Sequence, residues 1–479
     1  MRPLVWFRSD LRVRDNTALH EACQAAGDGV VAVFTICPDQ WREHDWAPVR
    51  VDFLLRNLRD LSESLGQLQI PLLIVKTPQF AEVPGRLLQV AEQHGCGGVW
   101  FNREYEINEQ RRDERVAELF ERAGKAVHGF TDQVILPPER VRTTQGKFYT
   151  VFTPYQRSWI AAVKAARESS GLRCLPRPRK QKPIPARAGT VPESVAGFEG
   201  LRRPDLWPSG EQAAGRRLES FIAGRLKAYA KARDFPAVHG TSTLSPYLAL
   251  GVLSPRQCLH AVLEANGNRL DSGSQGASTW ISELVWREFY RHVLVGFPRV
   301  GKNEPFDLRT RQIRWRDDEA GFRRWQEGRT GVPIVDAGMR QLAQTGWMHN
   351  RLRMIVAMFL TKNLLIDWRR GEKHFLRNLV DGDFANNNGG WQWSASVGTD
   401  AAPYFRIFNP VSQSERFDPK GEFIRMFVPE LAEVEGKAIH LPRDRAVGAA
   451  KWLDYPEPIV DLKVSRQRAI EEFRRVLER

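Results

Sequence analysis

Residues 381–406, DGDFANNNGGWQWSASVGTDAAPYFR, bring together aspartates, three consecutive asparagines, a Gly-Gly pair and two tryptophans. Asparagine and glycine tolerate positive φ and favour tight turns, so we expect a turn-rich backbone that approaches a planar, polar ligand closely. Trp391 and Trp393 would present aromatic faces beside that ligand. The alternative interpretation is a turn-rich surface loop with two tryptophans in the core.

A second chemistry-bearing stretch, STWISELVWREFYRH (278–292), has helical periodicity. One face of this helix is too polar for a core and too aromatic for a water-facing surface, which favours the lining of a cavity. Aromatic rings can stack on bases, and Glu283 can hydrogen-bond a base edge or donate a proton. The alternative is a buried helix with a Glu283–Arg287 ion pair. The residues that share this face are Trp280, Glu283, Trp286, Arg287 and Tyr290.

The stretch GWMHNRLRMIVAMFL predicts a helix that begins polar and becomes almost wholly apolar beyond Met354. Asn350, Arg353 and Met354 share one face, and Arg351 lies to one side. A buried arginine needs a carboxylate partner, whereas a helix end at the surface would leave its arginines solvated. The candidate partners are Asp381 and Asp383.

The stretch GTSTLSPYLALG (240–251) is rich in hydroxyl groups. Ser254 and Pro255, just after it, are a good N-cap and first residue for a helix. Hydroxyls and main-chain N–H groups near helix starts can form an anion cradle, although helix capping alone explains many such sequences. The hydroxyl residues are Thr241, Ser242, Thr243 and Ser245.

Composition narrows the class of protein. A chain of 479 residues predicts two or three domains. The net charge of +14 favours nucleic acid as a partner, although a positive balance can also serve solubility alone. There are 15 tryptophans, and their concentration between residues 280 and 393 indicates an aromatic-lined site there. The sequence has no run of 18 apolar residues, no signal-peptide pattern and no CxxC, so we expect a cytoplasmic protein with reduced thiols.

The order of elements predicts an α/β N-terminal domain with a five-stranded parallel Rossmann-like sheet, followed by an all-helical C-terminal domain. Residues 1–135 would form the sheet, 136–207 an interdomain connection and 208–479 the helices. No GxGxxG follows the first strand, but a ligand could still bind at the carboxyl ends of the strands. The proline-rich, basic part of the connection, 171–190, predicts an irregular, solvated segment.

Apolar runs mark the strands, at 4–7, 30–35, 71–76, 97–101 and 126–130. Helical periodicity marks the segments 49–65, 107–123, 211–232, 254–266, 275–296, 333–345, 347–369 and 371–380, and a charged amphipathic helix at 461–479.

Several of these strings resemble the photolyase/cryptochrome family: DGDFANNNGGWQWSASVGTDAAPYFRIFNP, WREFYRH and GWMHNRLRM. The strings LVWFRSDLRVRDNTAL, YEINEQRRD and VILPPERV resemble the same family, so the resemblance covers nearly the whole chain. Within the family, the chain is most similar to the class I photolyases of bacteria, which repair cyclobutane pyrimidine dimers. The resemblance implies an antenna chromophore in the N-terminal domain, and FAD and the DNA lesion in the helical domain.

The resemblance implies a U-shaped FAD whose isoalloxazine lies beside its adenine. Arg353 and Asp381 would form an ion pair beside the flavin ring, which favours the anionic reduced flavin. Asn387 would face flavin N5, where an amide can both donate and accept a hydrogen bond. The other implied flavin contacts are Tyr229, Thr241, Ser242, Thr243, Leu244, Ser245, Trp280, Gly382 and Asp383.

Three tryptophans match the family's electron-transfer chain from flavin to surface: Trp391, Trp368 and Trp315. Indole can be oxidised to a radical, and short hops between rings are faster than one long jump. The alternative for any one of them is a packing role.

The lesion pocket implied by the resemblance uses the helix face of Glu283 and Trp286. The dimer must leave the duplex to reach the flavin, which costs least at a damaged, poorly stacked site. Reduced FAD would give one electron to the dimer, and Glu283 would hydrogen-bond the dimer carbonyl and stabilise the radical anion, without a metal or a covalent nucleophile. The other implied contacts with the dimer or the DNA are Arg233, Arg287, Tyr290, Asn350, Arg351, Met354, Trp393 and Gln413.

The antenna implied by the resemblance is 5,10-methenyltetrahydrofolate, held by His44, Asn108, Glu109 and Lys302; a deazaflavin, or no antenna, is the alternative. We expect a monomer that binds UV-damaged DNA, without a membrane or an obligate protein partner. A cryptochrome-like photoreceptor, a (6-4) photolyase and a plain DNA-binding flavoprotein are the competing functions. The presence of Glu283, Trp286 and Trp393 favours the enzyme, and Asn350 and Met354 replace the paired histidines of the (6-4) subgroup.

Overall fold

The computed structural model describes residues 1–168, 172–442 and 454–478. These residues form two compact units, each made of several chain segments. The first unit comprises 1–227, 242–298 and 380–383, and the second comprises 228–241, 299–379 and 384–479. The predicted domain limits at residues 135 and 207 stay a prediction, and residue 171, where the predicted proline-rich segment starts, lies outside the described residues.

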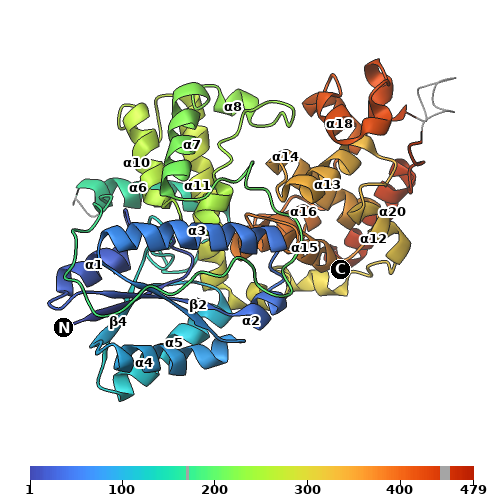
Figure 1. Cartoon of the computed structure of the whole chain (residues 1–479). Coiled ribbons are helices and arrows are strands. Elements are labelled where there is room, and N and C mark those ends of the chain that lie inside the picture. Colours follow the sequence, from blue (N-terminus) through green and yellow to red (C-terminus); the bar gives the residue numbers. More distant parts are fainter. Residues whose placement is uncertain (169–171, 443–453, 479) are drawn as a thin grey trace. The chain divides into compact units, whose positions relative to one another are not determined.

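The first unit is built on the predicted five-stranded parallel sheet, with strand order β3-β2-β1-β4-β5. Every residue of β1, β2 and β4 is buried, because helices cover both faces and the strands therefore read as continuous apolar runs. Helices α1 and α3 cover one face, and α4 and α5 cover the other (Figure 1). The strands are β1 Pro3–Phe7, β2 Val31–Ile36, β3 Leu72–Lys76, β4 Gly98–Asn102 and β5 Ala126–Phe130; the helices are α1 Thr17–Ala25, α2 Pro38–Glu43, α3 Pro48–Gln67, η1 Phe80–Glu82, α4 Val83–Gln93 and α5 Ile107–Arg122.

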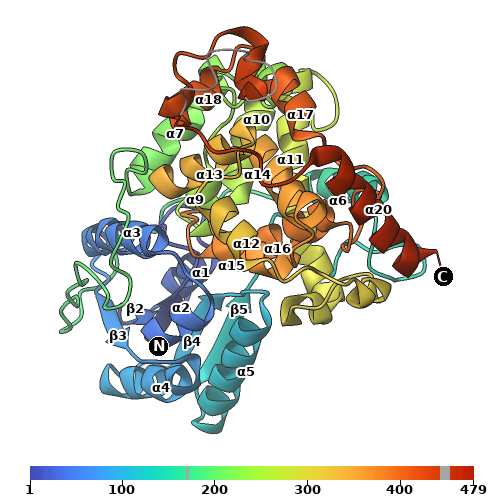
Figure 2. The ribbon, with the colours of Figure 1, turned by 90° about the vertical axis from the view of Figure 1, so that its right-hand side faces the viewer.

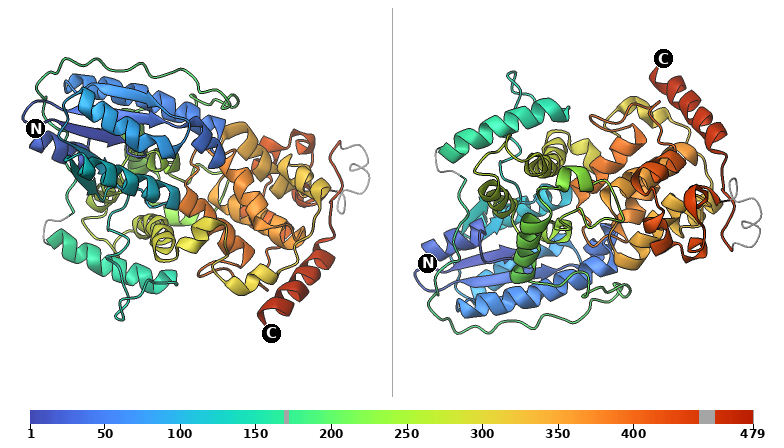
Figure 3. Two further views of the ribbon diagram at one scale, coloured as in Figure 1. Left: turned by 90° about the horizontal axis from the view of Figure 1, so that it is seen from below. Right: turned by 90° about the horizontal axis from the view of Figure 1, so that it is seen from above.

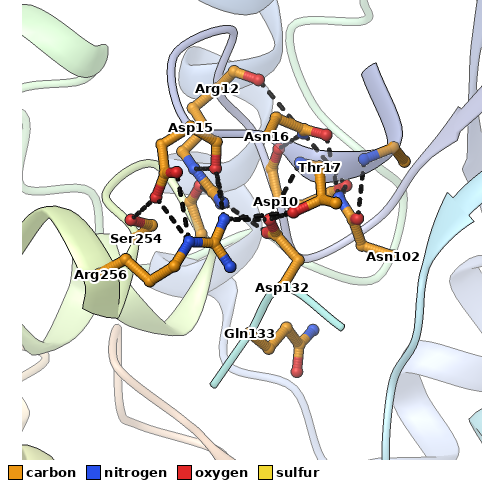
Figure 4. A network of polar contacts seen from close by, with 12 residues as sticks. Asp10, Arg12, Asp15, Asn16, Thr17, Asn102, Asp132, Gln133, Ser254 and Arg256 are labelled. Carbon is orange, nitrogen blue, oxygen red and sulfur yellow. Dashed lines mark hydrogen bonds and ion pairs between the residues drawn. The ribbon is translucent and has the colours of Figure 1, made fainter. Parts of the chain in front are cut away.

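The start of α1, at the carboxyl ends of β1 and β4, is occupied by the protein's own side chains (Figure 4). The first N–H groups of this helix donate to Asp132 at Thr17, to Asn102 at Ala18 and to Asn16 at Leu19, at 3.0 to 3.1 Å. The phosphate groups of a dinucleotide would need these N–H donors. Because the donors are already bonded to side chains, a dinucleotide cannot bind at this helix start. This agrees with the absence of GxGxxG from the sequence.

Asp132 also joins the sheet to helix α10. Its carboxylate is wholly buried and pairs with Arg12 and with Arg256, the latter at 2.8 Å. These two guanidinium groups hold the pKa of Asp132 at about 2 despite its burial. Arg256 also pairs with Asp15 at 3.1 Å, and Ser254 donates to the same carboxylate. The network therefore fixes the loop after β1 against the start of α10.

The connection after α6 (Phe152–Glu168) is irregular and most of its described residues between 172 and 190 are exposed, as predicted, but it is also hydrogen-bonded to the sheet domain. Gln181 N–H donates to Leu68 O at 2.9 Å, and Gly189 N–H donates to Leu72 O at 2.8 Å. Arg59 of α3 donates to Pro192 O at 2.8 Å. Figure 3 shows the segment as a long trace beside the helices of the sheet domain. It covers edge strand β3, whose unpaired main-chain groups need partners.

Helix α6 precedes this connection, and further helices of the first unit follow it. The predicted helix over 211–232 is interrupted, because α7 ends at Gly224 and α8 begins only at Tyr229, in the second unit. Ser254 caps α10 through a capping box with Gln257, and Pro255 is its first residue, as predicted. The helices are α6 Phe152–Glu168, α7 Glu211–Gly224, α9 Ser245–Ala249, α10 Pro255–Ala265 and α11 Gln275–Gly296.

The second unit is helical, and its apolar core is centred on α13, α14 and α15. The helix predicted over 347–369 is wrong in its length: α14 ends at Met358, a π-helical turn follows, and Leu365 has a φ of 54° before α15 begins. The helices are α8 Tyr229–Ala232, η2 Pro298–Lys302 (which begins in the first unit), η3 Leu308–Gln312, α12 Glu319–Gln326, α13 Pro333–Thr345, α14 Asn350–Met358, η4 Phe359–Asn363, α15 Trp368–Leu376, α16 Phe384–Ala395, α17 Pro410–Phe417, α18 Glu422–Phe427, η5 Pro429–Leu431, η6 Gly436–His440 and α20 Leu462–Leu477.

The asparagine- and glycine-rich stretch within 381–406 is mainly helix, which corrects the prediction of a turn-rich backbone. Residues 384–395 form α16, which includes all three asparagines, both glycines and both tryptophans. Positive φ occurs only after this helix, at Ser396 and Asp400. Helix α16 lies beside α15 (Figure 2). Packing against that neighbour outweighs the weak helix propensity of asparagine and glycine.

Candidate active site

Helix α11 carries the predicted polar and aromatic face within the first unit. Trp286 is half-buried and stacks on Phe152, with ring centroids 3.6 Å apart and planes at 4°. Tyr290, one turn further, lies 5.6 Å from the Trp286 centroid. Glu283, one turn before Trp286 in the helix, is half-buried. Trp280 is 3% exposed and packs on Phe221, so it belongs to the core side of this face.

Arg287 is not directed to solvent. It donates to Gln133 O at 2.6 Å and to Leu248 O at 3.3 Å. Burial, and then the neighbouring Arg291, lower its pKa to about 10. Its geometry gives no support to the predicted DNA contact, which stays a prediction.

Arg291, one turn beyond Arg287, pairs with Asp383 inside the first unit. The Arg291 side chain is 4% exposed and the Asp383 side chain 11%. Nε and Nη1 of Arg291 have no hydrogen-bond partner among the described residues, so buried donors remain there for another acceptor. Sequence reasoning missed Arg291, although its spacing of eight residues from Glu283 places it on the same helix face.

The hydroxyl-rich stretch holds a strained residue at its centre. Thr243 has a φ of 51°, which is unfavourable for a β-branched side chain. Its hydroxyl accepts from Arg217 at 2.8 Å and donates to Ser242 O at 2.8 Å. Leu244 is 1% exposed and anchors the stretch in the core, while Ser242 and Ser245 are half-buried. Fixed, strained main chain of this kind is typical of a ligand cradle.

In the second unit, two arginines predicted to contact DNA share one acidic partner. Arg351 pairs with Asp234 at 2.8 Å, and Arg233 lies 3.9 Å from the same carboxylate. The Arg233 guanidinium also lies over the ring of Tyr229, at 5.5 Å from its centroid. Sequence reasoning missed Asp234, which directly follows Arg233 in the chain.

Helix α17 adds to this cluster. The Arg351 guanidinium lies over the Phe417 ring of α17, at 4.4 Å. Gln413 is one turn before Phe417, so it lies on the same helix face.

The start of α14 carries the other predicted lesion contacts. Asn350 is exposed, and Arg353 and Met354 are half-buried. Arg353 Nε donates to Met348 O at 2.9 Å. Beyond Met354 the helix is buried, as predicted. Arg353 belongs to the second unit and Asp381 to the first, so their ion pair stays a prediction.

Helix α16 positions Asn387 and Trp391. Asn387 is 8% exposed and donates through Nδ2 to Glu372 O at 3.1 Å, which fixes the amide orientation. Trp391 is 2% exposed, and its Nε1 has no partner among the described residues. Trp393 is half-buried.

Trp391 lies against α15, where Gly371 leaves no room for a side chain. A Cβ atom at Gly371 would be 2.1 Å from Cη2 of Trp391. Trp368, one turn earlier on α15, is 1% exposed. Trp315 is half-buried and packs edge-on against Phe473, at 6.2 Å. Among the described residues, no ring contact joins Trp368 to either of the other two, so the order of the predicted chain stays a prediction.

Three predicted antenna residues meet in the first unit. His44 Nε2 accepts from Asn108 Nδ2 at 2.9 Å and from Gln40 Nε2 at 3.0 Å, while Nδ1 lies 3.4 Å from Glu109. Burial, with Arg50 next, lowers the pKa of His44 to about 4. Burial, with neighbouring carboxylates, raises the pKa of Glu109 to about 8. At pH 7 this is a mainly neutral hydrogen-bonding site; Lys302, exposed, belongs to the second unit.

Family models match both parts of the chain. The model described as "DNA photolyase" matches residues 3–178, and the one described as "FAD binding domain of DNA photolyase" matches residues 280–475. The deoxyribodipyrimidine photo-lyase of Salmonella typhimurium is 46% identical over 97% of this chain and 96% of its own length.

Solved structures agree with these matches. A bacterial class III photolyase from Agrobacterium tumefaciens has a TM-score of 0.89 and 36% identity, over 100% of this chain and 98% of its own. A Synechocystis cryptochrome has a TM-score of 0.85 and 30% identity, over 98% of this chain and 99% of its own.

The fold and the FAD-binding helical region define a flavoprotein of the photolyase and cryptochrome class. Within that class, this chain belongs to the DNA photolyase family.

The described residues contain no group of three or more His, Cys, Asp or Glu side chains arranged to hold a metal ion. None of the helices within the described ranges has the length and apolar character needed to cross a membrane.

The predicted FAD site fits this chain. Within the first unit, the N–H groups of Arg291 that have no partner among the described residues lie beside Asp383, and the strained main chain lies at Thr243; Asp383 and Thr243 are both matched to flavin contacts. Buried donors without protein acceptors are the pattern that a polar cofactor leaves behind.

Proposed function

We propose that this protein uses FAD and light to split cyclobutane pyrimidine dimers in DNA. The observation that carries the proposal is the near full-length, 46% identical match to a deoxyribodipyrimidine photo-lyase. When bound in its reduced form, FAD supplies one electron to the dimer after absorbing light and recovers it once the cyclobutane ring has opened.

The residues of α11 bind the dimer. Glu283, in its protonated form, donates a hydrogen bond to a dimer carbonyl and stabilises the negative charge that develops there. Trp286, held flat by its stack on Phe152, supports one face of the flipped-out bases. Asn350, Met354 and Trp393 complete the pocket.

The DNA backbone is bound by arginines of the second unit. Arg233 and Arg351 are oriented by Asp234 and are half-buried, so each can still offer N–H groups to a phosphate. Gln413 is placed beside them on α17. The chain's net charge of +14 supports the same role, because phosphate contacts dominate DNA affinity.

With FAD bound, Asn387 would offer its amide to flavin N5, and Arg353 and Asp381 would favour the anionic form. Thr241, Ser242 and Ser245 bind phosphate oxygens, with Thr243 fixing their main chain. Tyr229, Trp280, Leu244, Gly382 and Asp383 complete the flavin contacts. Trp391, Trp368 and Trp315 carry electrons from the surface to oxidised flavin.

For the antenna we propose methenyltetrahydrofolate at His44, Asn108 and Glu109, with Lys302. The support is the hydrogen-bonding character of the first three residues, which suits the donor and acceptor groups along the edge of a pterin ring. We further propose that the protein acts as a monomer in the cytoplasm, at the nucleoid when bound to DNA.

The test is an absorption spectrum of the purified protein, followed by blue-light repair of a thymine-dimer oligonucleotide with reductant present. Light-dependent loss of the dimer is the expected result, and an extra near-UV band would identify the folate. Flavin bands without repair of either dimer or (6-4) lesions would replace the enzyme with the photoreceptor function that the cryptochrome relative suggests.

A further inference from the structure

A second indole, Trp325 of α12, lies directly against Trp391. The two ring centroids are 6.1 Å apart and their planes cross at 74°. The other ring in contact with Trp391 is Phe375, at 4.9 Å and 82°. Among the described residues these two are the ring contacts of Trp391, and phenylalanine is much harder to oxidise than indole. The oxidisable ring that touches Trp391 is therefore Trp325.

Trp325 is placed so that it could lose an electron but not a proton. It is 0% exposed, and its Nε1–H donates to Val356 O at 3.1 Å. A main-chain carbonyl is not a base, so an oxidised Trp325 would keep its N–H proton and remain a radical cation. An oxidised Trp391 would also keep its N–H proton, because its Nε1 has no hydrogen-bond partner among the described residues.

The ring neighbours of Trp325 put no full positive charge against it at neutral pH. His374 contacts Trp325 edge-on at 5.4 Å, and burial with Arg377 lowers its pKa to about 4, so it is neutral at pH 7. Phe322 stacks on the far side at 5.8 Å and 17°. The Arg370 guanidinium lies over the Phe322 ring, at 4.1 Å from its centroid, and not over the Trp325 ring itself. The electrostatic surroundings therefore allow a positive charge on this indole.

We infer that Trp325 is a redox partner of Trp391, a buried side branch of the tryptophan chain. One electron passes from Trp325 to the oxidised Trp391 ring; Trp391 returns to its neutral form and Trp325 becomes the radical cation, with no proton moved and no bond broken. The inference rests on the proposed function, in which light oxidises Trp391. Among the described residues, the other rings in contact with Trp325 are Phe322, His374 and Phe375, all harder to oxidise than indole, so the branch ends at Trp325 and the charge leaves by returning through Trp391.

Trp325 would hold the positive charge temporarily. While the positive charge is on Trp325, it is one ring further from the flavin, and back transfer is slower. If the two indoles share the charge equally, only half of it is adjacent to the flavin, and recombination slows about twofold. Every 1.4 kcal/mol by which Trp325 is favoured would add about a further tenfold.

The test uses FAD-loaded protein with oxidised flavin and laser-flash detection of the tryptophan radical. In Trp368→Phe the main exit is closed, so the charge can only recombine or visit Trp325. Adding Trp325→Phe should shorten the radical lifetime at least about twofold. Equal lifetimes in the single and double variants would overturn the inference.

Two further variants control for a folding defect in Trp325→Phe. His374→Lys keeps Trp325 but places a positive charge against it, and in the Trp368→Phe background it should also shorten the lifetime. Phe375→Leu disturbs packing on Trp391 without removing an oxidisable ring, and should leave a lifetime clearly longer than that of the Trp325→Phe double variant. If Trp325→Phe does not fold, an unchanged lifetime in the His374→Lys variant overturns the inference.

Trp391→Phe separates this inference from the proposed function. It should abolish the early tryptophan radical altogether. If the radical persists there, the assignment of Trp391 as first donor fails, whatever the Trp325 variants show. If it disappears there but Trp325→Phe has no effect, only the side branch is wrong.

Discussion

At the residue scale, Glu283 is the side chain on which repair should depend most directly. Replacing it with alanine removes the hydrogen bond to the dimer carbonyl. A hydrogen bond to a charged group is worth about 1.5–3 kcal/mol, so we expect the quantum yield of repair to fall about tenfold or more. Glu283→Gln, whose amide still donates, should retain more activity than Glu283→Ala.

The measurement is photons absorbed per dimer repaired, in protein with full FAD content. Glu219→Ala, which removes an exposed carboxylate from α7 in the same unit, is the matched control. An unchanged yield in Glu283→Ala would remove the role assigned to this residue.

Glu109 should make the stability of the protein depend on pH. Its pKa is about 8 in the folded protein and near 4.5 when unfolded, so the folded state binds more protons between these values. Stability therefore falls as pH rises through this window. His44, with its folded pKa near 4, has the opposite effect, but only below about 6.5. Between pH 6.5 and 8 His44 no longer contributes, and buried Lys362 has an opposite effect that is the same in the parent and in a Glu109 variant, so the difference between the two proteins reports Glu109.

Thermal unfolding at pH 6.5 and pH 8 tests this. Across this interval the melting temperature of the parent should fall relative to that of Glu109→Gln, which keeps every other titrating group but not Glu109. Identical slopes in the two proteins would show that Glu109 is ionised normally.

At the element scale, the ion-pair network that joins the loop after β1 to helix α10 should contribute strongly to stability. Arg256→Met would leave Asp15 and Asp132 with one fewer cation in a site without water access. Breaking such a buried pair costs about 3–5 kcal/mol. Denaturant unfolding measures the loss, and Arg115→Met, an exposed arginine on α5, should change little. A loss below about 1 kcal/mol would mean that Arg12 alone suffices for Asp132.

The π-helical turn after α14 holds a buried lysine. Lys362 donates to Ala395 O at 3.0 Å and lies over the Phe473 ring at 3.3 Å, without a carboxylate in contact. Burial lowers its pKa well below 10.5. The unfolded chain then binds a proton that the folded one does not, so stability rises with pH up to about 10.5.

Lys362→Met should remove that rise and leave stability at pH 7 equal or higher. The free energy of unfolding, compared at pH 7 and pH 9, gives the answer. A variant that keeps the full pH dependence would exclude Lys362 as its source.

Element types were predictable where one pattern dominated. The five strands and the helices α11 and α13 were recognisable because continuous apolar runs and 3.6-residue periodicity were unbroken. Helix α16 was not, because its Asn-Asn-Asn-Gly-Gly run has low helix propensity and only the packing against α15 makes it helical. The break inside 347–369 was missed for a related reason: the apolar sequence continues through the π turn and gives no stop signal.

At the scale of the whole molecule, net charge should set DNA affinity. Arg351→Ala should weaken binding to damaged and undamaged duplex alike and reduce the slope of log affinity against log salt by about 0.9. Arg466→Ala, an exposed arginine of α20, removes the same charge and is the control. A loss confined to damaged DNA would place Arg351 in the lesion pocket instead of on the backbone.

The family, and with it the kind of site, could be read from long strings of residues, but the partners within the site could not. Asp234, Arg291 and Trp325 are far in sequence from the residues they contact, or lie in stretches without a motif. The closed start of α1 also depends on Asn102 and Asp132, which are brought together only by the sheet. Such pairings follow from tertiary structure, which spacing along one element does not encode.

The contact between Gly371 and Trp391 has a consequence for how this protein can change. Even one methyl group at position 371 would push on the indole ring, although residue 371 contributes no side chain to any ligand or redox step. A single-nucleotide change to alanine could therefore alter light-driven activation while every tryptophan and every flavin contact stays intact. In a comparison of variants, this glycine is a position where loss of photoreduction would look, from the residues alone, to have no cause.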